Sequence, residues 1–260
     1  ILIDEYDKPL LQNLHDEETQ NRFRNMLKPF YGVLKTMDRA IRFALLTGVT
    51  KFGKVSVFSD LNNLDDISMR EPYAAICGIT ETELRTHFDE DIHTLASALE
   101  RTYEEARSLL RKRYDGYHFV AGGPGIYNPF SLLNTFKYMW LSDYWFETGT
   151  PTYLVELLKR TNYDLYDMAN TETDADVLNS IDSASNNPIP VIYQSGYLTI
   201  KDYEPEFKIY RLGFPNQEVE EGFMKYLLPF YTNIQASKSP FEIGRFVREV
   251  RAGDYDAFFH

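Results

Sequence analysis

The sequence of 260 residues has a single cysteine, five histidines and an excess of acidic over basic side chains. With Cys77 alone, an internal disulfide and a zinc site built from several cysteines are both excluded. The histidines show neither an HExxH nor an H-x-H spacing, which disfavours a metal site held by imidazoles. Cys77 is therefore interpreted as a small buried side chain, and the composition fits a reducing, cytoplasmic compartment.

Positive charge is also scarce, since 27 Lys and Arg face 39 Asp and Glu for a formal net charge of -12. This balance argues against a basic surface that covers nucleic acid, although it leaves a local basic patch open. No run of residues approaches the roughly 18 uncharged residues of a membrane span, so no membrane partner is expected. The hydrophobic fraction of 43% is that of an ordinary folded protein with one large domain or two smaller ones.

The first 50 residues carry the pattern of a strand, a helix and a second strand. Residues 1–3 are a short apolar run of the kind that is buried on both faces of a parallel sheet, and this run ends in two acids at its carboxyl edge. Residues 17–37 place apolar side chains three and four positions apart, which predicts an amphipathic helix. These side chains are Phe23, Met26, Leu27, Phe30, Leu34 and Met37. Pro29 lies among them and is expected to kink or divide the helix. Residues 41–48 are interpreted as the second strand, parallel to the first through a right-handed crossover.

Helix starts dominate the middle of the sequence. Capping boxes begin at Thr80 and Thr102, each with a glutamate three positions later. The pairs Asn128-Pro129 and Thr150-Pro151 place a capping residue before a proline at the first helical position. The middle of the chain is therefore predicted to be mainly α-helical.

The last third of the sequence combines a polar stretch with strand signals. Residues 170–190 are poor in large apolar side chains, so this stretch is the best candidate for a linker. Residues 196–203 and 207–212 are rich in strand-forming residues and are separated by a short turn, which predicts a β-hairpin. Pro215-Asn216 then begins another helix. Helix, hairpin and helix in this order predict a small winged-helix-like unit.

The adjacent acids Asp4 and Glu5 are the most informative pair in the sequence. An apolar strand that ends in two acids is the Walker B arrangement, in which the first carboxylate helps to hold Mg²⁺ and the second orients or deprotonates the attacking water. Thr47 or Thr50, at the end of the neighbouring strand, would be the polar sensor of the γ-phosphate. The alternatives are a strand end that meets solvent and a glycine-containing turn, and the residues alone leave them open.

One further stretch, GVTKFGKV at residues 48–55, nearly matches the phosphate loop G-x-x-x-x-G-K-[ST]. The position that should carry a hydroxyl for Mg²⁺ is Val55. A phosphate loop also normally precedes its Walker B strand rather than following it. We therefore interpret this stretch as a coincidental match.

Several longer strings resemble the prokaryotic AAA-ATPase-like family, and the resemblance runs along nearly the whole sequence. The strings are IDEYDKPL (3–10), LTGVTKF (46–52), FSDLNNL (58–64), ICGIT (76–80), YDGY (114–117), YNPFSLL (127–133), YWFETGTP (144–151), YQSGYLTI (193–200) and LGFPN (212–216). The resemblance implies a P-loop ATPase core, a helical and winged-helix-like continuation and, often, a restriction-endonuclease-like domain at the carboxyl end. It also implies Mg²⁺ and ATP as ligands.

By this resemblance Asp4 matches the acid on the Mg²⁺ side, Glu5 matches the catalytic acid, and Thr47 or Thr50 matches the sensor. The family's phosphate loop lies before the Walker B strand, so we expect the sequence to be a fragment that lacks it, and a nuclease-like domain would begin near Asp254. The expected fold is α/β at the N-terminus, with a partial P-loop NTPase parallel sheet, followed by a mainly α region with a winged-helix-like β-hairpin. The expected domains are 1–70, 71–180 and 181–260.

The leading functional interpretation is a truncated ATPase-like protein whose partner, in the intact protein, is a nucleotide. The rival is a binding module whose helical and winged-helix-like regions recognise protein or nucleic acid without catalysis. Salt-dependent DNA binding by residues 181–260 would favour this rival. A carbohydrate-processing enzyme is the weakest alternative, because no acid pair is placed by a motif.

The first prediction concerns ATP. Without the backbone N–H groups, the lysine and the hydroxyl of a phosphate loop, residues 1–260 are expected to bind and hydrolyse ATP weakly or not at all. A steady-state hydrolysis assay with Mg²⁺ and ATP checks this. Substantial turnover that disappears in Glu5→Gln would refute it.

Overall fold

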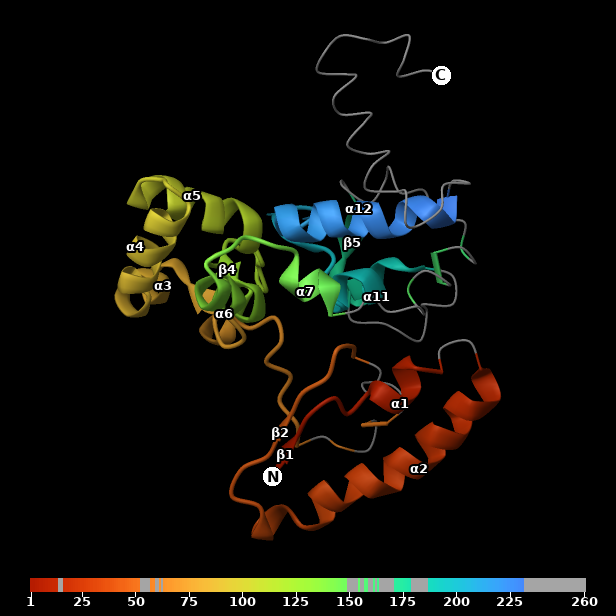
Figure 1. Ribbon diagram of the computed structural model, residues 1–260. Helices are drawn as coiled ribbons and strands as arrows, with labels where there is room; N and C mark the ends of the chain where they lie inside the picture. The colour runs from red at the N-terminus through yellow and green to blue at the C-terminus, as the bar shows by residue number, and fades with distance from the viewer. Residues whose placement is uncertain are drawn as a thin grey trace.

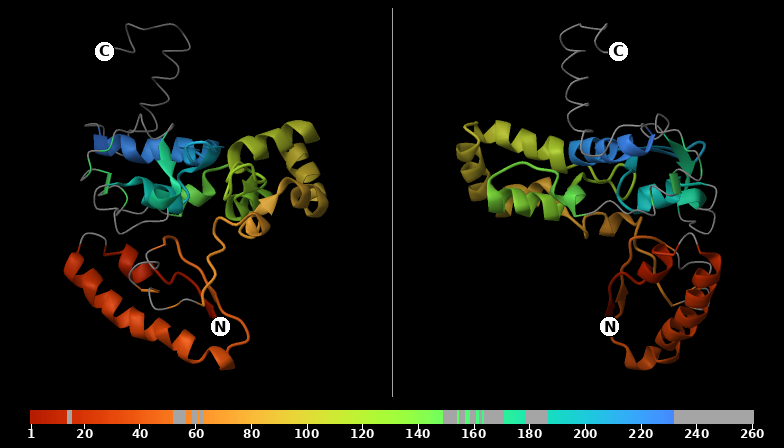
Figure 2. Two further views of the ribbon diagram at one scale, coloured as in Figure 1. Left: turned by 180° about the vertical axis from the view of Figure 1, so that it is seen from behind. Right: turned by 45° about the vertical axis from the view of Figure 1, so that its right-hand side comes forward.

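The computed structural model describes residues 1–13, 16–51, 57–58, 61, 63–148, 154, 157–158, 161, 163, 171–178 and 187–231. Helices and small sheets alternate along the chain, and the fold is mixed α/β. In all three views an N-terminal α/β part lies on one side of the molecule, below a helical middle region and a C-terminal unit that lie side by side (Figures 1 and 2). No helix within these residues is both long and apolar enough to cross a membrane.

The N-terminal part is built on two parallel strands. Its elements are β1 (Leu2–Ile3), α1 (Lys8–Leu11), α2 (Glu17–Thr36), the 3-10 helix η1 (Asp38–Ala40) and β2 (Leu45–Leu46). Leu2 pairs with Leu45 and Ile3 with Leu46 in parallel register, which confirms the predicted pairing. The second strand is shorter than residues 41–48. Backbone hydrogen bonds extend the ladder at both ends, from the Leu45 amide to the Ile1 carbonyl at 3.0 Å, from the Thr47 amide to the Ile3 carbonyl at 2.8 Å and from the Tyr6 amide to the Thr47 carbonyl at 3.0 Å.

Helix α2 differs from its prediction in two ways. It runs unbroken through Pro29, so it is not divided there, and the proline lies on the exposed side of the helix, where its ring does not meet the core. Its buried side is formed by Tyr31 and Leu34, and Tyr31 contacts the ring of Phe58 at 5.2 Å between centroids. Three residues of the predicted face are instead exposed, namely Met26, Phe30 and Met37. The helix has two apolar stripes, and spacing alone does not say which one meets the core.

The middle region is helical, as predicted, and has a core of its own. Its elements are η2 (Glu71–Tyr73), β3 (Ile79–Thr80), α3 (Glu81–His87), α4 (Asp89–Ala98), α5 (Tyr103–Tyr114), β4 (Ile126–Tyr127), α6 (Pro129–Tyr138) and α7 (Tyr144–Glu147). The capping boxes at Thr80 and Thr102 and the cap at Asn128 are all confirmed. Fully buried side chains from four helices, including Leu84, Leu95, Leu110 and Leu132, form the core of this region.

Two other expectations for this region have different outcomes. Cys77 is exposed rather than buried, because it lies in the turn between η2 and β3 beside the equally exposed Ile76. The helix start predicted at Thr150-Pro151 lies outside the described residues.

The C-terminal unit holds a three-stranded antiparallel sheet. Its elements are β5 (Glu172–Asp174), α10 (Ala175–Leu178), α11 (Ile189–Gln194), β6 (Thr199–Glu204), β7 (Ile209–Gly213) and α12 (Gln217–Tyr231). The strand order is β5-β7-β6, so the predicted hairpin is confirmed. The helix start at Asn216 is also confirmed, since its side chain accepts a hydrogen bond from the Val219 amide at 3.1 Å. Residues 172–178 are not a linker, because β5 pairs with β7 and α10 packs against α11.

Glu218 on α12 connects this unit to the middle region. Its carboxylate is fully buried and accepts hydrogen bonds from the Ser131 hydroxyl on α6, at 2.8 and 2.9 Å, and from the Trp145 amide on α7, at 2.9 Å. Burial raises the pKa of Glu218 to about 7, and these hydrogen bonds and the charge of Arg113 only partly oppose that rise. The junction between the two units therefore titrates near neutral pH.

This titration predicts a pH-dependent difference in stability between the natural protein and Glu218→Gln. Between the unfolded pKa near 4.5 and the folded pKa near 7, the folded state keeps a proton that the unfolded state releases, so the contribution of Glu218 to stability falls as the pH rises through this window. The difference in the free energy of unfolding between the natural protein and Glu218→Gln should change by roughly 2–3 kcal/mol across this window. Urea unfolding at pH 5, 6 and 7.5 measures it, with the exposed Glu220→Gln as control. A gap that stays constant over this range contradicts the assignment.

Candidate functional site

The carboxyl ends of β1 and β2 bring Asp4 and Thr47 together. Each residue directly follows its strand, and the strands are parallel neighbours, so their ends meet at the same edge. The Thr47 hydroxyl donates a hydrogen bond to the Asp4 carboxylate across this edge. The backbone amide of Glu5 donates to the same carboxylate oxygen at 3.0 Å. Asp4, Glu5 and Thr47 are all exposed, so a ligand in solvent reaches them directly.

Glu5 has an unusual backbone conformation. Its φ of 50° lies in the left-handed region, which residues with a side chain rarely adopt and which is often found at functional sites. Its carboxylate forms an ion pair with Lys8 at 2.6 Å, and this hydrogen bond, together with the charge of Glu5, raises the pKa of Lys8. A ligand that uses the Glu5 carboxylate therefore competes with Lys8 for it.

Thr50, the second sensor candidate, points elsewhere. Its hydroxyl and its amide donate to the buried carboxylate of Asp7 at 2.5 and 2.6 Å, and the Val49 amide donates to the other oxygen at 3.1 Å. The Asp7 carboxylate thus stabilises the turn after β2. A side chain at Gly48 would place its Cβ 2.6 Å from the Asp7 carboxylate, so this turn requires glycine there. The structure places Thr47, and not Thr50, beside Asp4.

The oxygen atoms at this edge suit a hard cation. The Asp4 carboxylate and the Thr47 hydroxyl are oxygen donors of the kind that Mg²⁺ takes, and this ion keeps several waters and substrate phosphates rather than a complete protein cage. The described part of the chain contains no cluster of three or more His, Cys, Asp or Glu side chains that could hold a metal by themselves.

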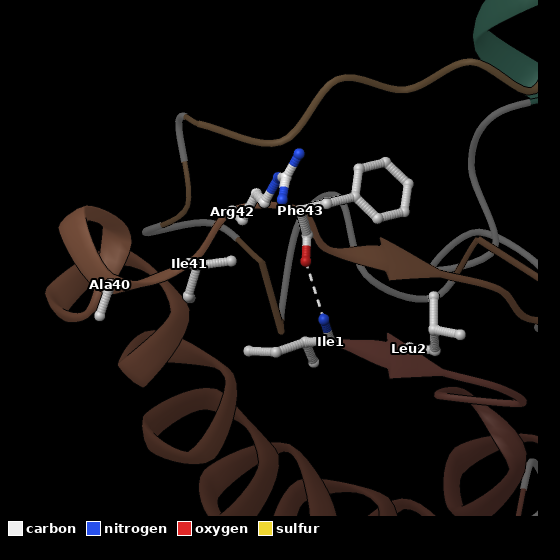
Figure 3. A pocket seen from close by; sticks show the side chains of 6 residues that line it. All are labelled: Ile1, Leu2, Ala40, Ile41, Arg42 and Phe43. Carbon is white, nitrogen blue, oxygen red and sulfur yellow. Dashed lines mark hydrogen bonds between the residues drawn. The ribbon is translucent and has the colours of Figure 1, made fainter.

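Two other features do not belong to this site. A shallow hollow of about 550 Å³ lies at the opposite, amino ends of the strands, where the Ile1 amine donates to the Phe43 carbonyl at 2.8 Å (Figure 3). Ligands of parallel sheets bind at the carboxyl ends of the strands, so this apolar hollow is not the expected position for a phosphate. Residues 52–55 of the near match to a phosphate loop lie outside the described residues.

Sequence reasoning missed Asp7, although it lies three positions after Asp4 in the same string. Its partners, Val49 and Thr50, are more than 40 residues away in the sequence. The available signal was a third acid directly before a short helix. This signal alone does not distinguish a buried carboxylate that stabilises a turn from an exposed helix cap.

Comparison with known proteins gives a family match for the N-terminal part of the chain. Residues 1–58 match the family model described as predicted AAA-ATPase. Over 242 residues the chain is 38% identical to an uncharacterized protein in the vnfD 5′ region of Azotobacter chroococcum mcd 1, a match that covers 91% of this chain and 44% of that protein. The chain thus spans less than half the length of this relative. No solved structure matches the chain.

The contrast between the buried Asp7 and the exposed Asp4 yields a prediction. Asp7→Ala leaves two amides and one hydroxyl without their acceptor and should lower the free energy of unfolding by about 2–3 kcal/mol. Asp4→Ala, at an exposed position, should change it by less than about 0.5 kcal/mol. Urea unfolding of both variants at pH 7 makes the comparison. Equal losses would mean that the two carboxylates do not have the separate roles described here.

Proposed function

We propose that residues 1–58 form the catalytic edge of an ATP-hydrolysing site. Asp4 lies on the Mg²⁺ side, Glu5 orients or deprotonates the attacking water, and Thr47 is the sensor of the γ-phosphate. The observation that carries the proposal is the hydrogen bond from Thr47 to Asp4 across two parallel strands. The match of the same residues to a predicted AAA-ATPase family supports it.

The chemistry of the three side chains fits these roles. A bound Mg²⁺ would supply charge stabilisation for the phosphates, and the Asp4 carboxylate would help to hold it. The Thr47 hydroxyl, now turned to Asp4, is placed to donate to a phosphate oxygen at the same edge. Glu5 is exposed and adjacent, so its carboxylate reaches a water at the strand ends once it leaves Lys8. Each role uses an oxygen atom that solvent already contacts.

The test is Mg²⁺-dependent ATP hydrolysis by the complete product of the gene, with residues 1–260 assayed beside it. Glu5→Gln should lower kcat by about 10²-fold or more, as the loss of a general base does. Asp4→Asn should raise the Mg²⁺ concentration needed for activity. Glu18→Gln, an exposed acid in the first turn of α2, is the matched control and should leave kcat unchanged. Hydrolysis that is absent, or equal in all variants, overturns the proposal.

A second candidate function is protein binding by the C-terminal unit. A short strand, two helices and a hairpin follow one another in this unit, and the three strands form one antiparallel sheet. This order supports a winged-helix-like unit. Its features disfavour nucleic acid as the partner. Four of the six residues of α11 are buried and apolar, and Arg211 on the hairpin is paired with Asp202. Salt-dependent binding of duplex DNA by residues 1–260 would reverse this preference.

A further inference from the structure

The side-chain amide of Gln194 links two distant parts of the chain. The Lys51 backbone amide donates to the Gln194 Oε1 at 2.6 Å, across 143 positions of sequence. The Gln194 Nε2 donates in turn to the Leu178 carbonyl at 2.5 Å. Lys51 follows the turn after β2 in the N-terminal part, whereas Leu178 and Gln194 end α10 and α11 of the C-terminal unit. The side-chain amide of Gln194 therefore connects the N-terminal part to the C-terminal unit.

The chemistry of this link requires a glutamine. Its oxygen accepts from an N–H group and its nitrogen donates to a carbonyl, so both ends of the amide are used and its orientation is fixed by its partners. A glutamate keeps the acceptor for Lys51 but places an oxygen against the carbonyl of Leu178. An alanine loses both hydrogen bonds.

On the N-terminal side, the link reaches the candidate site through a short and well-held segment. Only three residues separate Thr47 from Lys51, and Asp7 holds two of them by three hydrogen bonds. The Tyr6 hydroxyl also donates to the Thr50 carbonyl at 2.8 Å. The Lys51 side chain pairs with Asp66 at 3.3 Å. These contacts make residues 47–51 a short, well-held segment, so the position of Lys51 bears directly on the position of Thr47.

On the C-terminal side, the contact of Gln194 with Leu178 involves two helices, and each of these helices is connected in sequence to an outer strand of the sheet. Helix α10 directly follows β5, and α11 continues through Gly196, with φ at 83°, and Tyr197 into β6. Strands β5 and β6 flank β7 on either side. The N-terminal and C-terminal parts also contribute side chains to one apolar cluster, for example Leu10 and Leu34 with Leu178 and Ile192. The hydrogen bonds of Gln194 are directional, and they lie alongside apolar packing between the same two parts, which is not directional.

We propose that Gln194 is a positioning residue for the site at Asp4 and Thr47, and that it couples this site to the C-terminal unit. This inference rests on the proposed function. Through Gln194 the C-terminal unit fixes where the Thr47 hydroxyl lies relative to Asp4. By thermodynamic linkage, a nucleotide bound at the strand ends changes the hairpin unit, and a partner bound to the hairpin unit changes nucleotide affinity by the same factor.

The first experiment tests the link itself, without nucleotide. Amide hydrogen exchange is measured on residues 1–260 in the natural sequence and in Gln194→Ala, Gln194→Glu and Gln217→Ala. Gln217 is the matched control, since it is a glutamine of the same unit whose amide donates to Glu221 within α12. Gln194→Ala should speed exchange at Lys51 about tenfold, with smaller increases at residues 47–50. Gln194→Glu should give an intermediate increase at Lys51. Unchanged exchange at Lys51 in Gln194→Ala overturns the proposal.

The second experiment tests the coupling, by ATP hydrolysis with the complete gene product. Misplacement of Thr47 should lower kcat about three- to tenfold in Gln194→Ala while KM for ATP stays within about twofold, since the loss acts on positioning rather than on binding. Gln217→Ala should leave both constants unchanged. A loss of folding in Gln194→Ala would instead lower the active fraction of that variant, which its unfolding curve detects.

The outcomes separate this inference from the function on which it rests. If the natural protein hydrolyses ATP and Gln194→Ala keeps its kcat, the coupling is wrong and the ATPase assignment survives. If the natural protein does not hydrolyse ATP but Lys51 exchange responds to Gln194, the ATPase assignment is wrong, and Gln194 is a structural tie without a catalytic role. Faster Lys51 exchange together with the kcat loss supports both.

Discussion

The parallel pairing of β1 with β2 is the constraint on which the functional account depends. It places the end of each strand at one edge, so an acid that follows the first strand meets a threonine beside the second. An antiparallel pairing of the same two segments would put Asp4 and Thr47 at opposite ends. The helix between the strands makes the parallel arrangement the accessible one, because parallel neighbours need a long crossover.

The buried carboxylates of this protein differ from the exposed ones in their contacts. Asp7 and Glu218 are fully buried, and each ties elements that are far apart in sequence. Asp7 accepts hydrogen bonds from three donor groups, and Glu218 accepts them from two. Asp4 and Glu5 are exposed and have few partners within the protein, which leaves their oxygens available to a ligand. A buried charge without partners is costly, whereas an exposed one is not, so the exposed pair needs no partners within the protein and is the pair to which the proposed function assigns a ligand.

Local patterns predicted the elements well and the long-range contacts poorly. The capping boxes at Thr80 and Thr102 were predictable because cap and partner lie three residues apart. Strand β5 was not, since Glu-Thr-Asp at a sheet edge has no apolar alternation. Asp4, Glu5 and the two sensor candidates Thr47 and Thr50 were predicted from strand ends, but only the structure shows that Thr47 lies beside Asp4. The contact of Gln194 joins segments that no local pattern relates.

The most direct test of the central claim is a double-mutant cycle between Asp4 and Thr47, read as kcat/KM for Mg²⁺-dependent ATP hydrolysis by the complete gene product. If the two side chains act together at one nucleotide site, the losses in Asp4→Asn and Thr47→Val are not additive, and the double variant is about as slow as Asp4→Asn alone. Losses that multiply, or no loss in either single variant, would contradict the account.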